Sequence, residues 1–221
     1  MEAKPITAGR NTHEREVFAL PKEKQQAILR AGYRVFSQNS YKKSPMQEIA
    51  KEAGISKSLL FYYFRNKRAL YLYLWDHCAR VTISGLKEHG CYGQADFFGM
   101  LLRGMQAKLA IMRQYPEMGR FVVRAFYEKD PQVGPVIRRS VKRYKAFREE
   151  ALFANLDRSR FADGLDLSMM IREMYLASEG YLWEMLLQGP LNPEKMERDF
   201  LQLIGFWKSV YEKKEGENEG H

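Results

Sequence analysis

The chain has 221 residues, of which 45% are hydrophobic and 29% charged, which is the composition of an ordinary globular protein. Its length suits one large domain or a small domain joined to a larger one. Two cysteines, Cys78 and Cys91, are too few for a disulfide framework. The sequence shows no signal-peptide core and no apolar run long enough to span a membrane, so we expect a cytoplasmic protein.

The net charge of +9 is unevenly distributed along the chain. Residues 1–75 contain 14 Lys and Arg against 6 Asp and Glu, a net charge of +8, whereas residues 76–221 contain 22 against 21. This asymmetry favours a polyanionic partner for the N-terminal third, because cations that bind phosphates release condensed counterions. The alternative is a basic face that only keeps the protein soluble.

The first twenty residues show no apolar periodicity, and we expect a mobile arm there. From Pro21 the apolar residues recur at intervals of three and four, which predicts a helix that ends at the NSYKK turn of residues 39–43. Ser44 followed by Pro45 indicates the N-cap and the first position of a second helix. That helix should end at Gly54, because glycine adopts a left-handed turn with the least strain.

Ser56 is the expected N-cap of a short third helix, KSLLFYYF. A long fourth helix should begin near Lys67, pass Val81 and stop at the EHGCYGQ stretch. Four more helical segments are expected at residues 94–114, 117–128, 132–155 and 166–188, followed by a ninth helix after Pro193. No segment alternates with period two for long enough to suggest a sheet, so the expected fold class is all-α.

The second and third helices fit a helix-turn-helix, in which two short helices cross steeply and need small residues at the crossing and a tight turn. Ala50, Ala53 and Gly54 meet this requirement. The outward face is short, polar, aromatic and basic, as a helix in a major groove should be. Lys67 adds a cation beside free backbone N–H groups, which suits a phosphate oxygen. The other candidates on this face are Gln47, Lys57, Ser58, Leu59, Tyr62 and Tyr63, of which the tyrosines could instead form an aromatic core cluster.

The run from Ile28 to Leu70, with the core IAKEAGISKSLLFYYFRNKRAL at residues 49–70, closely resembles the DNA-binding domain of the TetR family. The resemblance covers roughly the first third of the chain, and the remainder is similar only in length and helical texture. The family pattern is matched by Phe36, Ser44, Ile49, Ala50, Ala53, Gly54, Ile55, Ser56, Tyr63, Phe64, Lys67 and Leu70.

The resemblance implies a set of DNA-contacting roles. Gln47, Lys57 and Leu59 would face base edges, whereas Ser44, Ser58, Tyr63 and Lys67 would bind the DNA backbone. Three departures from the family pattern are Ser58, where glycine or proline is usual, Phe61, where a tyrosine hydroxyl commonly meets a phosphate, and Ser40, which replaces the usual turn glycine.

Segment 166–188 and the last helix each carry two apolar faces, which implies two neighbours: the chain's own core and a symmetry mate. The family resemblance likewise implies a four-helix bundle between two subunits. Methionines and aromatics of the middle helices suit an adaptable ligand pocket as well as a plain core. The expected dimer interface contains Tyr181, Met185, Phe200, Ile204 and Trp207. The candidate pocket residues are Met105, Phe121, Phe126, Tyr127, Tyr144 and Met174, while Arg103, Arg120, Arg124 and Glu173 could orient a polar ligand group or lie on the surface.

These patterns predict a mobile arm at 1–20, a helix-turn-helix DNA-binding domain at 21–66, a helical ligand-binding and dimerisation domain at 67–212 and a disordered tail at 213–221. The expected function is that of a homodimeric transcriptional regulator that binds a palindromic operator in double-stranded DNA. We expect a repressor that a small, mainly apolar ligand releases from DNA, since repression is the commoner mode in the family that the chain resembles.

The alternatives are a DNA-compacting protein without sequence preference and an enzyme with an unrecognised site. The sequence contains no Walker A loop, no HExxH motif and no nucleophile elbow, so no enzyme is expected. His77, Cys78, His89 and Cys91 fit no common zinc spacing, and we expect no metal, no cofactor and no membrane partner.

Overall fold

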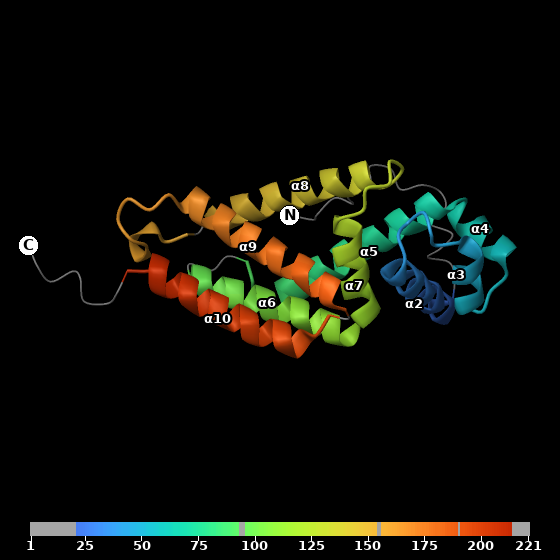
Figure 1. Cartoon of the computed structure of the whole chain (residues 1–221), viewed down its shortest axis with the longest axis horizontal. Coiled ribbons are helices and arrows are strands. Elements are labelled where there is room, and N and C mark those ends of the chain that lie inside the picture. Colours follow the sequence, from blue (N-terminus) through green and yellow to red (C-terminus); the bar gives the residue numbers. More distant parts are fainter. Residues whose placement is uncertain (1–20, 93–95, 154–155, 190, 214–221) are drawn as a thin grey trace, which may run out of the picture. The chain divides into compact units, whose positions relative to one another are not determined.

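The computed structural model describes residues 21–92, 96–153, 156–189 and 191–213. The expected mobile arm lies outside these residues. The described residues form α-helices joined by short turns, one 3-10 helix and an isolated bridge between Phe161 and Glu212, so the all-α expectation is confirmed (Figure 1). The helices are α2 (Lys22–Gln38), α3 (Met46–Glu52), α4 (Lys57–Phe64), α5 (Lys67–Glu88), α6 (Phe97–Gln114), α7 (Pro116–Phe126), α8 (Gly134–Phe153), α9 (Leu167–Gln188) and α10 (Pro193–Tyr211), with η1 (Arg158–Arg160) between α8 and α9.

The chain packs as two compact units, neither of which is continuous in sequence. Unit 1 contains residues 1–82 and 115–145, and unit 2 contains residues 83–114 and 146–221. Unit 1 therefore combines α2, α3, α4 and most of α5 with α7 and the first half of α8. The boundary expected at residue 66 separates DNA binding from ligand binding, and it stays a prediction. The packing unit around the three N-terminal helices extends well beyond residue 66.

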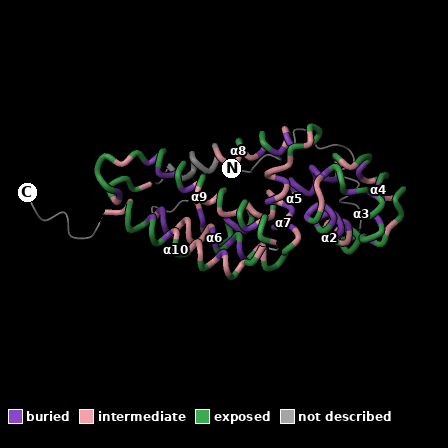
Figure 2. The backbone as a smooth tube through the Cα atoms, viewed as in Figure 1, coloured by how far each residue is buried: buried purple, intermediate pink, exposed green. Residues whose placement is uncertain are grey.

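Unit 1 is built around a cluster of buried aromatic rings. Phe36 of α2 meets Tyr71 of α5 edge-on at 4.9 Å between ring centroids, and Tyr71 meets Phe121 of α7 at 5.1 Å. All three side chains are buried, and the buried run Leu70–Asp76 of α5 is drawn in purple in Figure 2. Burial of such large rings stabilises the contact of α7 with the N-terminal helices, since each ring removes a large apolar area from water.

Polar contacts join the same parts of unit 1. The Ser37 hydroxyl of α2 donates to the Glu117 carboxylate of α7 at 2.6 Å. The backbone N–H of Tyr41 donates to the Glu128 carboxylate at 2.9 Å, and the Tyr41 hydroxyl donates to the side chain of Gln132 at 3.0 Å. The segment that follows α7 is therefore bonded directly to the turn after α2.

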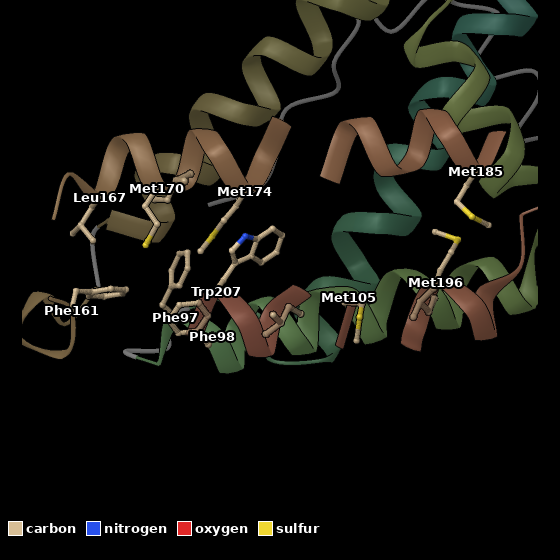
Figure 3. Close-up of a cluster of buried hydrophobic side chains, with 13 residues drawn as sticks. Phe97, Phe98, Met105, Phe161, Leu167, Met170, Met174, Met185, Met196 and Trp207 are labelled. Atoms are coloured by element: carbon tan, nitrogen blue, oxygen red, sulfur yellow. The ribbon is translucent and has the colours of Figure 1, made fainter. Parts of the chain in front are cut away.

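Unit 2 is organised around α6, α9 and α10, and α10 runs alongside α6 (Figure 1). Figure 3 shows Met185 of α9 and Met196 of α10 pointing toward one another, and Trp207 of α10 lying next to Met174 of α9. The buried cluster also includes Phe97, Phe98, Met105, Leu109, Phe161, Leu167, Met170, Ile171 and Ile204.

The last described residue of unit 2 corrects one expectation. The expected disordered tail includes Lys213, yet the backbone N–H of this residue donates to the Arg160 carbonyl at 2.9 Å and its ammonium lies 2.7 Å from the Asp163 carboxylate. Lys213 therefore belongs to the folded chain, and the rest of the expected tail, residues 214–221, lies outside the described residues.

Candidate nucleic-acid interface

The turn between α3 and α4 has the hydrogen bonds of a glycine-terminated helix. The N–H of Ile55 donates to the Ala50 carbonyl at 3.0 Å, and the N–H of Gly54 donates to the Lys51 carbonyl at 3.1 Å. Gly54 has a φ of 65°, a conformation that costs a residue with a Cβ atom more than it costs glycine. The expected helix end at Gly54 is confirmed.

Helix α4 is capped and anchored as its sequence predicts. The Ser56 side chain accepts a hydrogen bond from the N–H of Leu59 at 3.1 Å, which confirms Ser56 as the N-cap. Leu60 and Phe64 are buried, one turn apart on the inner face. These contacts fix α4 on α3 while leaving its opposite face in solvent.

The exposed face of α4 carries most of the residues expected to meet DNA. Lys57 and Ser58 are exposed, and Tyr62 is 61% exposed. The Lys57 ammonium lies 5.9 Å from the centroid of the Phe61 ring, which is itself 36% exposed. Gln47 is exposed on α3. Leu59 and Tyr63 are partly exposed at the sides of this face, and the DNA contacts of all these residues stay predictions.

Lys67 lies at the first position of α5, where the Asn66 side chain accepts from the N–H of Ala69 at 2.9 Å and caps the helix. The Lys67 ammonium donates to the Lys42 carbonyl at 3.2 Å and lies 4.6 Å from the centroid of the Tyr41 ring. An ammonium has three donors, so this bond leaves capacity for a phosphate oxygen. The position agrees with the backbone-binding role expected of Lys67.

Ser44 differs from its expected role. The N-cap position of α3 is occupied by Pro45, and no side chain caps the helix. Ser44 is fully buried, and its hydroxyl donates to the Ser40 carbonyl one turn earlier at 2.9 Å. Ser44 therefore stabilises the turn after α2, and its side chain as placed is not accessible to a phosphate.

The net positive charge of unit 1 is larger than that counted over the first 75 residues of the sequence. Unit 1 contains 23 Lys and Arg against 10 Asp and Glu, a net charge of +13, whereas unit 2 contains 13 against 17, a net charge of −4. The difference arises from residues 115–145, which carry 8 basic and 3 acidic residues and fold with the N-terminal helices. A count along the chain misses this contribution, because it assigns these residues to the C-terminal part.

The six candidate pocket residues are divided between the two units. Met105 and Met174 lie in the buried cluster of unit 2, and the other four lie in unit 1. Phe121 is fully buried, and its ring packs against three other aromatic rings, so it is a core residue of unit 1. Phe126 stacks edge-on against Tyr127 at 5.0 Å, and Tyr144 is partly exposed.

The expected dimer residues lie on the inner sides of α9 and α10. Met185, Ile204 and Trp207 are buried in the chain's own cluster, and Tyr181 and Phe200 pack against it. As placed, the side chains of Met185, Ile204 and Trp207 are used within the chain, and an interface through the five residues stays a prediction. The large apolar residues that remain exposed on these helices are Met169, Leu176, Trp183 and Leu187 of α9 and Leu201, Phe206 and Val210 of α10.

A buried polar group joins α2 to α5 in unit 1. The Tyr33 hydroxyl lies 2.7 Å from Nδ1 of His77, and the Cys78 thiol donates to the same hydroxyl at 3.4 Å. Burial, with a smaller contribution from Arg80, lowers the pKa of His77 to about 4. Over the described residues, no three His, Cys, Asp or Glu side chains gather as metal ligands, and no helix combines the length and apolarity needed to cross a membrane.

Two short helices joined through a left-handed glycine, with a capped second helix exposed on a strongly basic unit, define a helix-turn-helix protein of the DNA-binding class. Residues 28–74 match the family model described as bacterial regulatory proteins, tetR family. The N-terminal part of the chain is therefore similar to the DNA-binding domain of the TetR family.

Two relatives and one solved structure match different shares of the chain. The regulator RutR of Escherichia coli K12 is 32% identical over 99 residues, which span 44% of this chain and 45% of RutR. AcrR of Shigella flexneri is 22% identical over 192 residues, which span 82% of this chain and 87% of AcrR. The transcriptional regulator FadR from Bacillus subtilis, in complex with stearoyl-CoA, has the same fold with a TM-score of 0.59 at 16% identity, covering 81% of this chain and 96% of FadR.

Proposed function

We propose that this protein is a sequence-specific transcriptional regulator that binds a palindromic operator as a homodimer and releases it when a small molecule binds. The observation that carries the proposal is the outer face of α4, where Lys57, Ser58 and Tyr62 are exposed on a unit with a net charge of +13. Such a face combines donors for base edges with cations for phosphates.

A DNA-compacting protein would need the charge but not the exposed recognition helix. Gln47 and Lys57 have the chemistry of base readout, since an amide or an ammonium can bond base edges in the major groove. Specific and non-specific binding of such proteins typically differ by about 10³-fold or more. A comparison of one operator with random DNA therefore separates a regulator from a compacting protein.

The assignment of roles is tested by two substitutions. Lys67→Ala should weaken binding to all DNA sequences alike and lower the slope of log affinity against log salt by about one, because it removes one phosphate contact. Lys57→Ala should cost roughly 1 to 3 kcal/mol at one base position and relax the preference there. Fluorescence anisotropy with an operator and with its single-base variants measures both effects.

The control is Lys87→Ala, which removes the same charge from an exposed position of unit 2. It should change neither the base preference nor the salt slope. Identical specificity profiles for Lys57→Ala and Lys67→Ala would contradict the assignment of one residue to base readout and the other to the backbone.

The proposed dimer uses the exposed apolar residues of α9 and α10 in place of the buried ones. Met169, Leu176, Trp183 and Leu187 are spaced by seven, seven and four residues, which places them on one side of α9. Phe206 is 61% exposed on α10. Apolar stripes on two helices suit an isologous contact, in which each subunit offers the same patch.

The proposed effector is small and mainly apolar. Methionine is frequent in the buried cluster of unit 2, and flexible thioether side chains allow a core to adapt its shape. The complex of FadR with stearoyl-CoA supports this class of ligand, since stearoyl-CoA joins a long apolar chain to an anionic group.

A further inference from the structure

Arg103 of α6 is partly exposed, but two of its N–H donors are buried without an acceptor. Its Nε and Nη2 atoms are both fully buried, and neither has a hydrogen-bond partner. A guanidinium remains charged in proteins, so both nitrogen atoms keep their protons and stay donors. A buried donor without an acceptor is unfavourable, so an acceptor bound at this edge would be stabilising.

The two unpartnered atoms form one edge of the guanidinium. Nε and Nη2 present two parallel N–H groups side by side, and this edge matches the two oxygens of a carboxylate or of a phosphate. A neutral carbonyl or hydroxyl would satisfy one donor at most, and a cationic ligand would be repelled. The geometry therefore favours an anion with two oxygens in one plane.

The acidic residue closest in sequence to this edge already has partners. Asp96 accepts from the N–H of Gly99 at 3.1 Å and lies 3.6 Å from the guanidinium of Arg160. Arg103 also acts on Cys91: burial raises the pKa of this thiol, and the charges of Arg103 and Lys108 lower it. Two cations thus act on one buried thiol, and the surroundings favour an added negative charge.

The rest of the surroundings is apolar. On the same helix, Phe98 and Met105 are buried in the cluster of unit 2, and Met100 and Leu102 pack against it. A ligand that placed its anionic group on Arg103 would therefore have its remaining atoms next to methionine and aromatic side chains. Such a ligand has one charged end and an apolar body.

We infer that Arg103 binds the carboxylate or phosphate of an otherwise apolar effector. The inference rests on the proposed function, whose effector it assigns to an anionic class. Binding gives the two buried donors of Arg103 an acceptor, so effector binding and the stability of unit 2 are coupled.

The test measures thermal unfolding with three probes of equal chain length: octanoate, octyl phosphate and octanol, each below the concentration at which it forms micelles. Octanoate or octyl phosphate should raise the Tm of the natural protein more than octanol does. Arg103→Gln should weaken binding of that anion by about 10- to 100-fold, because it removes a charged hydrogen-bonding pair. Arg158→Gln, which removes an arginine from an exposed position of unit 2, should leave the shift intact.

Arg103→Met gives a second readout that needs no ligand. An apolar side chain of similar length removes the two buried unpaired donors, so the Tm without probe should stay equal or rise, while the shift caused by the anion should disappear. An equal shift with octanol, an anion shift retained in Arg103→Gln, or no shift with either anion would overturn the inference. Operator binding by the natural protein without probes is measured alongside, and its absence would overturn the proposed regulator instead.

Discussion

Phe121 offers a direct test of how unit 1 is built. Its ring is fully buried and lies 5.1 Å from Tyr71, 5.5 Å from Tyr33 and 6.3 Å from Phe36, measured between centroids. Truncation of a buried phenylalanine to alanine costs about 3 to 5 kcal/mol, and each aromatic pair adds about 0.5 to 1.5 kcal/mol beyond burial. We expect Phe121→Ala to lower the free energy of unfolding by about 4 kcal/mol, a large part of the 5 to 15 kcal/mol typical of a folded protein.

The assay is urea unfolding followed by circular dichroism at one fixed protein concentration, since association would otherwise contribute to the apparent stability. Phe121→Leu should lose only about 1 to 2 kcal/mol, because leucine retains much of the apolar volume and loses the ring contacts. The matched control is Phe126→Ala in the same helix, where the ring is partly exposed and packs against Tyr127. A loss below about 1.5 kcal/mol for Phe121→Ala would refute the core assignment and favour a position at the edge of a pocket.

Two further predictions concern association and pH. Leu176→Glu or Phe206→Glu should convert a dimer to the single chain of 25.9 kDa in light scattering. The control Gln106→Glu adds the same charge at an exposed position of α6 and should leave the dimer intact. A dimer that persists in Leu176→Glu and in Phe206→Glu would exclude this face as the interface. Because burial lowers the pKa of His77 from 6.5 to about 4, the unfolded chain binds the proton first as the pH falls, so this residue's contribution to stability is complete above pH 6.5 and is lost toward pH 4. After allowance for the partial exposure of His77, the loss of stability is about 2 kcal/mol. His77→Asn keeps a polar group near the Tyr33 hydroxyl, and its free energy of unfolding should change between pH 7.5 and 4.5 by about 2 kcal/mol less than that of the natural protein. The same change in both proteins would show that His77 does not titrate in this range.

The helix-turn-helix could be predicted because its determinants are local. Gly54 ends α3 through its own backbone conformation, and Ser56 caps α4 through a hydrogen bond three residues away. Neither feature depends on distant packing, so the spacing of residue types is sufficient to locate it.

Ser44 shows where a local rule has two outcomes. A serine before Pro45 can cap the following helix, but its hydroxyl can also donate to a carbonyl of the preceding turn. In this chain the second bond forms, to Ser40, and the serine is buried. The sequence allows both arrangements, and the packing after α2 selects between them.

The face proposed for the dimer and the charge of unit 1 depend on non-local packing. Helices α9 and α10 are apolar on more than one side, and the packing of α6 and α9 around α10 places Trp207 inside and Phe206 outside. The basic residues of the segment 115–145 join the DNA-binding unit because Phe121 packs among the N-terminal rings. Neither fact has a signature in residue spacing alone.

Residues that bond to one another in unit 1 lie far apart in the sequence, and this separation matters during synthesis on the ribosome. Tyr41 and Glu128 are bonded although 87 residues separate them, and α2 packs on α7 across a similar distance. At translation rates of 5 to 20 residues per second, the N-terminal helices wait roughly 5 to 20 seconds for these partners. A nascent chain that already contains the whole helix-turn-helix thus has its aromatic rings uncovered, which makes it a substrate for chaperones before it can be a regulator.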